Sequence, residues 1–200
     1  MTHTNGWINT FTGKRFYFDN PNADSICIED IAHALAYTCR YNGHTRFFYS
    51  VAEHSMYVCE KIVEQLTAGD IAEEQLRKVA LQALLHDASE AYIADISSPL
   101  KRSPEFEFYR SLEKNIQNAI DIKFNVDLSF CDLTKKIDTQ MLGSEVLQLF
   151  RDIDPDWKIY LESIMNEKMP YIQCFRPADA EILFLRKFKT YEYASLPESV

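Results

Sequence analysis

Two of the five histidines in the chain stand beside carboxylates, in segments with helical periodicity. His54 follows Glu53 in SVAEHS, and His86 precedes Asp87 in ALLHDASEAY. Neutral imidazole nitrogens together with carboxylate oxygens suit a hard or borderline divalent cation. A further carboxylate must come from another helix, and Asp138 in TKKIDTQMLGSE is the best candidate because it is acidic within an otherwise amphipathic helix. We therefore expect these segments to share one metal ion.

Each of these residues also has a simpler interpretation. A single histidine on a helix is more often a surface residue or a hydrogen-bonded core residue than a metal ligand. Asp138 could be a solvated charge, or it could pair with Lys135 three residues earlier. The combination favours the metal site, because a histidine, a His-Asp pair and an aspartate fall on three separate expected helices. Glu90 adds a carboxylate one helical turn beyond His86, on the same face.

Helical periodicity dominates the chain after Ser25 and indicates the elements that must position these side chains. Pro155 and Pro177 fit the first turns of two such helices. Strand-like alternation is scarce, so we predict an all-α bundle of six or seven helices. The helices are expected at 28–35, 51–66, 76–83, 104–124, 132–150, 155–167 and 177–190.

Residues 5–25 differ from the rest because they are rich in aromatic residues, Asn, Gly and Asp. Thr12-Gly13-Lys14 is a turn candidate there, which predicts a short β-hairpin or an ordered arm.

The sequence has no internal repeats and no flexible linkers, so we interpret 1–200 as one domain. It comprises an N-terminal arm (1–25), a core (26–150) and C-terminal helices (151–200). Cysteines are odd in number and lack CxxC spacing, which favours buried reduced thiols. They are Cys27, Cys39, Cys59, Cys131 and Cys174.

The composition is that of an ordinary globular protein, with 46% hydrophobic and 26% charged residues among 200. A net charge of −9 without runs of Lys and Arg argues against binding of polymeric nucleic acid. A small phosphorylated substrate needs only a few local cations and stays possible. Apolar stretches are too short to span a membrane, and 1–7 lacks the features of a secretion signal, so we expect a cytoplasmic protein. A homo-oligomer, a dimer or larger, is the default expectation.

Three segments resemble the HD-domain phosphohydrolase superfamily: VAEHS, ALLHDASEAYIADISSPLK and IDTQML. The longest is similar to 5′-deoxynucleotidases of the YfbR type and to phage deoxynucleotide phosphohydrolases. The resemblance covers about residues 28–145, and HDASEAYIADISSPLK is its specific part. It implies a compact HD-domain helical bundle that carries one divalent cation, with Co, Mn, Zn, Ni, Fe and Mg as candidates.

Carried over to this sequence, the resemblance implies that His54, His86, Asp87 and Asp138 bind the metal and that Glu90 is the catalytic carboxylate. A metal with open positions can polarise a phosphate and acidify a water molecule. Glu90 could then act as general base, or it could protonate the leaving alkoxide through a water.

The resemblance also implies contacts with a substrate. Arg40-Tyr41 falls where the nucleotidases carry an Arg-Trp pair that orients the phosphate, but Tyr replaces Trp and the gap to His54 is one residue shorter. Lys101 could add a second positive charge. Individually, Arg40 and Lys101 are more often surface cations.

Asp95 and the turn that contains Ser97 and Ser98 are implied to contact the substrate as well, through hydrogen bonds to the sugar of a nucleotide. The alternative is that Asp95 and Ser98 cap the turn and the helix that follows it.

No histidine follows His86, whereas two-metal enzymes of this superfamily carry additional histidines before the last aspartate. The first hypothesis is therefore a one-metal 5′-deoxynucleotidase that releases phosphate from a deoxynucleoside monophosphate. The second is a deoxynucleoside triphosphohydrolase of the dATP type that releases tripolyphosphate, which extra cations around the phosphates would favour. A third, from another class, is a non-catalytic nucleotide-binding regulator, for which missing ligands are expected. A purely structural helical protein leaves the His/Asp coincidence unexplained.

Overall fold

The computed structural model describes residues 6–165 and 169–192, and this part of the chain is an all-α bundle with a small N-terminal hairpin. The seven long helices lie where seven were predicted, with ends that differ by up to about three residues, and the predicted end of the helix at 155–167 lies outside the described residues. Two four-residue helices, α4 and α5, were not predicted. The α-helices are α1 (Ile28–Tyr37), α2 (Val51–Thr67), α3 (Glu73–Leu84), α4 (Glu90–Ile93), α5 (Ser98–Lys101), α6 (Glu107–Lys123), α7 (Cys131–Leu149), α8 (Pro155–Ile164) and α9 (Pro177–Glu192). Short 3₁₀ helices cover Ala23–Ser25, Arg40–Gly43, Pro104–Phe106 and Leu128–Phe130.

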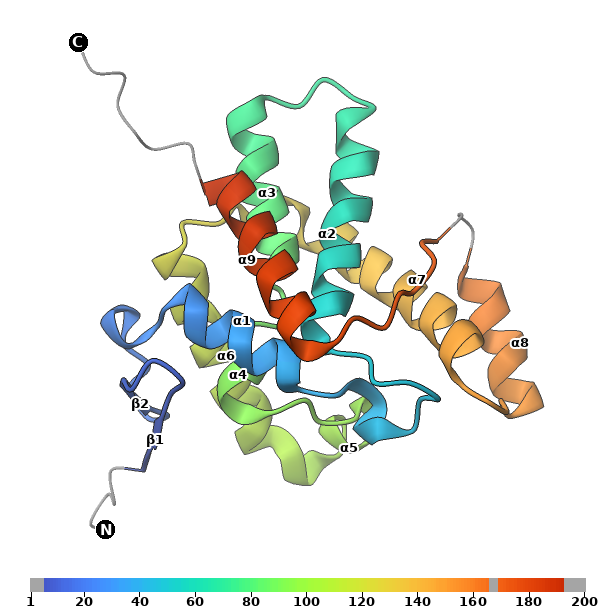
Figure 1. The fold of residues 1–200 in the computed structure, drawn as a ribbon, viewed down its shortest axis with the longest axis horizontal. Coiled ribbons are helices and arrows are strands. Elements are labelled where there is room, and N and C mark those ends of the chain that lie inside the picture. Colours follow the sequence, from blue (N-terminus) through green and yellow to red (C-terminus); the bar gives the residue numbers. More distant parts are fainter. Residues whose placement is uncertain (1–5, 166–168, 193–200) are drawn as a thin grey trace.

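The centre of the bundle is built around α2. Helices α2 and α3 lie side by side as an antiparallel pair, and α9 packs against both of them and against α1 (Figure 1). Helix α7 crosses α2 and carries α8 on its other side. Phe184 and Phe188 of α9 are buried in the core, one helical turn apart. Burial of each such side chain contributes about 1.5–3 kcal/mol, so α9 is an integral part of the bundle.

Gly143 permits the close approach of α7 and α8. A Cβ atom at this position would lie 2.7 Å from Met165 Cγ and 3.1 Å from the Leu161 carbonyl oxygen. These distances are shorter than ordinary van der Waals contacts, so a larger residue would push α8 away from α7.

Among the described residues, no helix combines the length and the apolar character needed to cross a membrane.

The predicted N-terminal hairpin is confirmed. Strands β1 (Trp7–Asn9) and β2 (Arg15–Tyr17) pair antiparallel, and the turn between them contains Gly13 with a φ of +83°, a conformation that favours glycine. Phe16 of β2 is fully buried and stacks on Tyr92 of α4, with 3.9 Å between ring centroids. The hairpin therefore packs against α4, the helix that follows His86 in the chain.

The thiols differ in part from the expectation. All five cysteines are free, as predicted, but only Cys59 is buried, and the other four are partly exposed. Burial raises the pKa of the Cys59 thiol to about 12.

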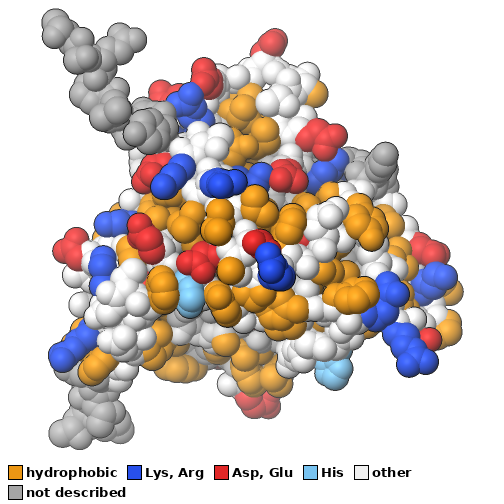
Figure 2. Space-filling model, viewed as in Figure 1, with side chains coloured by type: hydrophobic (Ala, Val, Ile, Leu, Met, Phe, Trp, Pro, Cys, Tyr) orange, Lys and Arg blue, Asp and Glu red, His pale blue; other side chains and the backbone are white. Residues whose placement is uncertain are grey.

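On the face shown in Figure 2, hydrophobic side chains form a band across the middle, in the region of α1 and α9, and charged side chains lie mainly above it and at the sides.

Candidate metal centre

The two histidines and two aspartates expected to share a metal lie together. His54 Nε2 is 3.3 Å from His86 Nε2 and 3.6 Å from Asp87 Oδ2. It is also 3.1 Å from Asp138 Oδ1, while His86 Nε2 is 3.2 Å from Asp87 Oδ2. One ligand atom from each of His54, His86 and Asp87 lies within 4.8 Å of the others, so this group could hold a metal ion. Asp138 joins the group through its contact with His54.

Three separate segments supply these side chains. His54 lies in the first turn of α2, where the Ser50 hydroxyl caps the helix by accepting from the Glu53 N–H at 3.1 Å. Asp138 lies in α7, and the crossing of α7 over α2 brings it to His54. The His86-Asp87 pair arrives from the end of α3, which lies beside α2.

The expected helical position of His86 is wrong. Helix α3 ends at Leu84, and residues 85–89 form successive tight turns before α4 begins. In a continuous helix the Ala83 carbonyl would accept from the Asp87 N–H. Here this carbonyl accepts from His86 Nδ1 at 2.8 Å. The turns let two consecutive side chains, His86 and Asp87, converge on His54, although neighbouring residues of a regular helix point about 100° apart.

The donor set fits a divalent cation. The Nδ1 atoms of both rings face groups that only accept, the Glu145 carboxylate for His54 and the Ala83 carbonyl for His86. When the two rings are neutral, both Nδ1 atoms carry the proton, and the lone pairs of both Nε2 atoms face each other at 3.3 Å. This arrangement is repulsive unless a positive charge, either a proton or a metal ion, lies between the rings. Donor atoms bound at about 2.0–2.2 Å to one ion lie roughly 3–3.5 Å apart when adjacent, which matches the observed spacing.

The electrostatics of the group point the same way. Burial disfavours a charged His86, but the neighbouring Asp87 carboxylate outweighs this and raises the pKa of His86 to about 9. Burial likewise opposes ionisation of Asp87, but His86, His54 and Arg40 hold the pKa of the Asp87 carboxyl far below its usual range. The cluster is thus a strong attractor of positive charge in a largely buried position.

Glu145 is the residue of this centre that the sequence analysis missed. It is fully buried on α7, and its Oε1 accepts from His54 Nδ1 at 2.5 Å. Two signals were available: Glu145 lies seven residues, or about two helical turns, after Asp138 on the same face of α7, and it is a carboxylate within a largely apolar run. Carboxylates that hold the second nitrogen of a ligand histidine are a common feature of metal sites.

Arg40 and Tyr41, expected to orient a phosphate, lie against the four candidate ligands, which we call the metal group. Arg40 Nη1 is 3.5 Å from Asp87 Oδ2 and Arg40 Nη2 is 3.4 Å from Glu145 Oε2. The Tyr41 hydroxyl donates to Glu145 Oε2 at 2.5 Å. Arg40 Nε is buried without a hydrogen-bond partner among the described residues. Burial opposes the charge of Arg40, but Glu145 and Asp87 raise its pKa well above the usual range.

Glu90 and Lys101 form a second charged pair beside the group. Glu90 opens α4, is 5% exposed and has its Oε1 3.7 Å from Lys101 Nζ. Its Oε2 is buried without a hydrogen-bond partner in the described part of the chain. Burial, together with the negative charges of Asp87 and Asp95, raises the pKa of Glu90 well above its usual range. Lys101 is held more tightly by Glu113, with 2.6 Å between Nζ and Oε1.

The turn that contains Ser97 and Ser98 is exposed. Ser97 occupies the N-cap position of α5, but no capping hydrogen bond by its side chain is found within residues 6–165 and 169–192. Asp95 follows Ala94, whose φ is +67°, and burial raises the pKa of Asp95. Lys135, the other partner considered for Asp138, instead lies 3.5 Å from Asp132.

Comparison with known proteins places the chain in a family. The uncharacterized protein YfdR of Escherichia coli is 36% identical over 183 residues, which cover 91% of this chain and 93% of YfdR. The chain belongs to the YfdR family. The uncharacterized protein RCAP_rcc00048 of Rhodobacter capsulatus is 36% identical to this YfdR-family chain over 122 residues, or 60% of the chain and 59% of that relative. No family model matches the chain.

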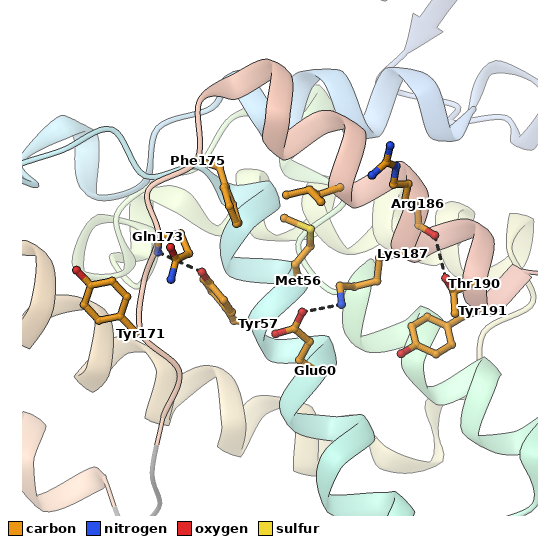
Figure 3. Close-up of a pocket in the computed structure, with 11 residues that line it drawn as sticks. Met56, Tyr57, Glu60, Tyr171, Gln173, Phe175, Arg186, Lys187, Thr190 and Tyr191 are labelled. Carbon is orange, nitrogen blue, oxygen red and sulfur yellow. Dashed lines mark hydrogen bonds and ion pairs between the residues drawn. The ribbon is translucent and has the colours of Figure 1, made fainter.

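Glu53, the other carboxylate beside His54, serves a different part of this YfdR-family protein. It is fully buried and accepts from the backbone N–H groups of Gln173, Cys174 and Phe175 at 2.8–3.1 Å, and from the Tyr57 hydroxyl at 3.0 Å. These bonds fix the segment that leads into α9. Tyr57, Gln173 and Phe175 also line a cavity of about 440 Å³ between α2 and α9, away from the metal group (Figure 3).

Proposed function

We propose that this protein is a metal-dependent phosphohydrolase of the HD-domain superfamily that acts on deoxynucleotides, as a 5′-deoxynucleotidase that releases phosphate from a deoxynucleoside monophosphate. One observation carries the proposal: His54 Nε2 and His86 Nε2 face each other at 3.3 Å while both Nδ1 atoms are held by acceptors. The carboxylates of Asp87 and Asp138 approach the same point. The specific HDASEAYIADISSPLK resemblance supplies the reaction class.

A divalent cation, when bound, supplies positive charge to a phosphoryl group and acidifies water. Two side chains beside the ligands are suited to the remaining tasks. Glu90, whose pKa is raised and whose Oε2 has no partner among the described residues, can hold a proton and pass it to the leaving alkoxide. Arg40 lies beside the metal group, has no hydrogen-bond partner for Nε in the part of the chain that the structure describes, and provides a positive charge against a phosphate.

The charges around the group favour a monophosphate over a triphosphate. The two cations placed nearest to it by sequence reasoning are both engaged by carboxylates, Arg40 by Asp87 and Glu145, and Lys101 by Glu113 and Glu90. A tripolyphosphate chain carries several more negative charges than a monoester and needs additional cations to offset them. The proposal therefore ranks phosphate release above tripolyphosphate release.

Incubation with dAMP and with dATP tests this ranking, with Mn²⁺, Co²⁺ or Zn²⁺ added and with phosphate and tripolyphosphate assayed separately. Asp138→Asn should lower turnover by about 100-fold or more, because even changes behind a metal ligand cost roughly 10–100-fold. Asp132→Asn is the matched control, since Asp132 lies fully exposed on the same helix. Tripolyphosphate release from dATP would favour the triphosphohydrolase over the 5′-deoxynucleotidase. Nucleotide binding without hydrolysis would instead support the regulator.

A further inference from the structure

We infer that Glu145 is the positioning residue of the metal centre: it holds His54 in the tautomer that binds a cation and sets the affinity of the site. This inference rests on the metal site of the proposed function. It assigns a role to a residue that touches none of the reacting groups.

The carboxylate of Glu145 is saturated with donors. Its Oε1 accepts from His54 Nδ1 at 2.5 Å and from the Tyr49 hydroxyl at 2.8 Å. Its Oε2 accepts from the Tyr41 hydroxyl at 2.5 Å and lies 3.4 Å from Arg40 Nη2. A carboxylate offers about four lone-pair sites, so these partners define its orientation completely. Because the side chain is fully buried, solvent does not compete for them.

This saturation has two consequences for the ligands. An ionised carboxylate only accepts, so the proton of neutral His54 must reside on Nδ1, and the Nε2 lone pair is left for the cation. The negative charge also makes the imidazole a stronger donor. The Arg40 guanidinium and the two tyrosine hydroxyls around Glu145 stabilise the ionised form of the carboxylate.

Arg40 extends the influence of Glu145 to a second ligand. Its guanidinium lies between Glu145 and Asp87, 3.4 Å and 3.5 Å from their carboxylate oxygens. One carboxylate on α7 is thereby connected to His54 on α2 and, through Arg40, to Asp87 on the turn after α3. Since Asp138 is on α7 as well, a single helix carries one ligand and orients two others.

Glu53 provides a matched control within the same region. It is fully buried like Glu145 and immediately precedes His54, but its carboxylate accepts from the backbone of 173–175 and from Tyr57. Glu53→Gln therefore removes an equivalent buried charge that contacts none of the ligands. If any buried negative charge in this region supported metal binding, Glu145→Gln and Glu53→Gln would lower the metal affinity equally.

Calorimetric titration of the metal-free full-length protein with Zn²⁺ or Mn²⁺ tests the inference. We expect Glu145→Gln to weaken binding by about 10–100-fold, whereas Glu53→Gln lowers the melting temperature and leaves metal affinity within about twofold of wild type. Histidine ¹⁵N spectra of the metal-free protein, recorded at a pH at which His54 is neutral, give a second readout: His54 should show the Nδ1–H tautomer in wild type and a mixture in Glu145→Gln.

The outcomes separate this inference from the proposed function. A wild-type protein that binds neither ion defeats the proposed function itself. Equal affinity of wild type and Glu145→Gln, or equal losses in the two glutamine variants, overturns only the role of Glu145. Should Glu145→Gln fail to fold, Tyr49→Phe removes one of the donors that hold the carboxylate and must then weaken metal binding, with Tyr57→Phe as its counterpart at Glu53.

Discussion

The candidate site has two halves that are built differently. The half proposed to bind a metal, the metal half, lies on two long helices, α2 and α7, and on the turn after α3. The half proposed to bind a substrate, the substrate half, lies on α4, α5 and the link between them. The metal half comprises His54, His86, Asp87, Asp138 and Glu145, and the substrate half comprises Glu90, Asp95, Ser97, Ser98 and Lys101. In the metal half, both Nδ1 atoms and both Glu145 oxygens have partners in the protein.

The substrate half shows the opposite character. Glu90 has a buried oxygen without a partner among the described residues, and Ser97 and Ser98 are exposed. Ala94 adopts a φ of +67° and a ψ of 159°, a region that is nearly restricted to glycine. Polar groups that the protein itself satisfies keep their geometry without a ligand, whereas buried unsatisfied groups carry a desolvation cost that a ligand can relieve. The difference suggests a preformed metal half and a substrate half that a ligand completes.

The largest expected effect is the loss of a metal ligand. A cation at 100 times its dissociation constant stabilises the folded state by about 2.7 kcal/mol, which raises the melting temperature of a chain of this size by roughly 5–10 °C. His86→Ala should abolish this rise, and His44→Ala, which changes an exposed histidine, should retain it. Calorimetric scans with and without Zn²⁺ or a chelator give the answer. A full metal-induced shift in His86→Ala would contradict the metal half.

A narrower loss, confined to turnover, is expected for Glu90→Gln. We predict a kcat lower by about 10²–10⁴-fold with unchanged metal affinity, whereas a ligand variant loses metal affinity as well as turnover. A carboxyl that donates its proton is active below its pKa, so the wild-type rate should fall as the pH rises through the raised pKa of Glu90. That alkaline decline should be missing in Glu90→Gln. Glu107→Gln, at an exposed position of α6, is the control.

Relief of the backbone strain at Ala94 should have a smaller effect, and this effect should be a gain in the free energy of unfolding. Ala94→Gly removes a penalty of about 1–3 kcal/mol, partly offset by the greater freedom of glycine in the unfolded chain. The net gain of about 1 kcal/mol should raise the melting temperature by roughly 2–4 °C. Ala68→Gly, at an exposed residue with a φ of −74°, should lower it slightly. Two decreases would show that the Ala94 backbone is unstrained.

The smallest effect is expected at the exposed serines of the substrate half. Ser98→Ala should leave the free energy of unfolding within about 0.5 kcal/mol of wild type. If the hydroxyl binds a substrate, the lost hydrogen bond should raise KM roughly 2- to 10-fold. Steady-state kinetics with dAMP measure this change. An unaltered KM removes Ser98 from the substrate half and leaves Asp95, Ser97 and Lys101 as the candidates for substrate contacts.

Residues with a local signature were predictable, and residues defined by distant partners were not. The hairpin followed from its aromatic residues and the Gly13 turn, and the long helices followed from apolar spacing, because both depend on short-range geometry. The role of Glu53 could not be foreseen, since its partners at 173–175 lie about 120 residues away. For the same reason Glu145 was overlooked, although its spacing from Asp138 placed the two on one face.

The sequence by itself determined the all-α class, the places of the long helices and the identity of the His and Asp residues worth testing, because helical periodicity and residue chemistry depend on neighbouring residues alone. Only the tertiary structure decided that α7 crosses α2 at His54, that the chain leaves α3 before His86, and that Glu145 stands behind the ligand. Those outcomes depend on how helices pack and on which donors remain for a buried carboxylate, and packing is a property of the whole chain.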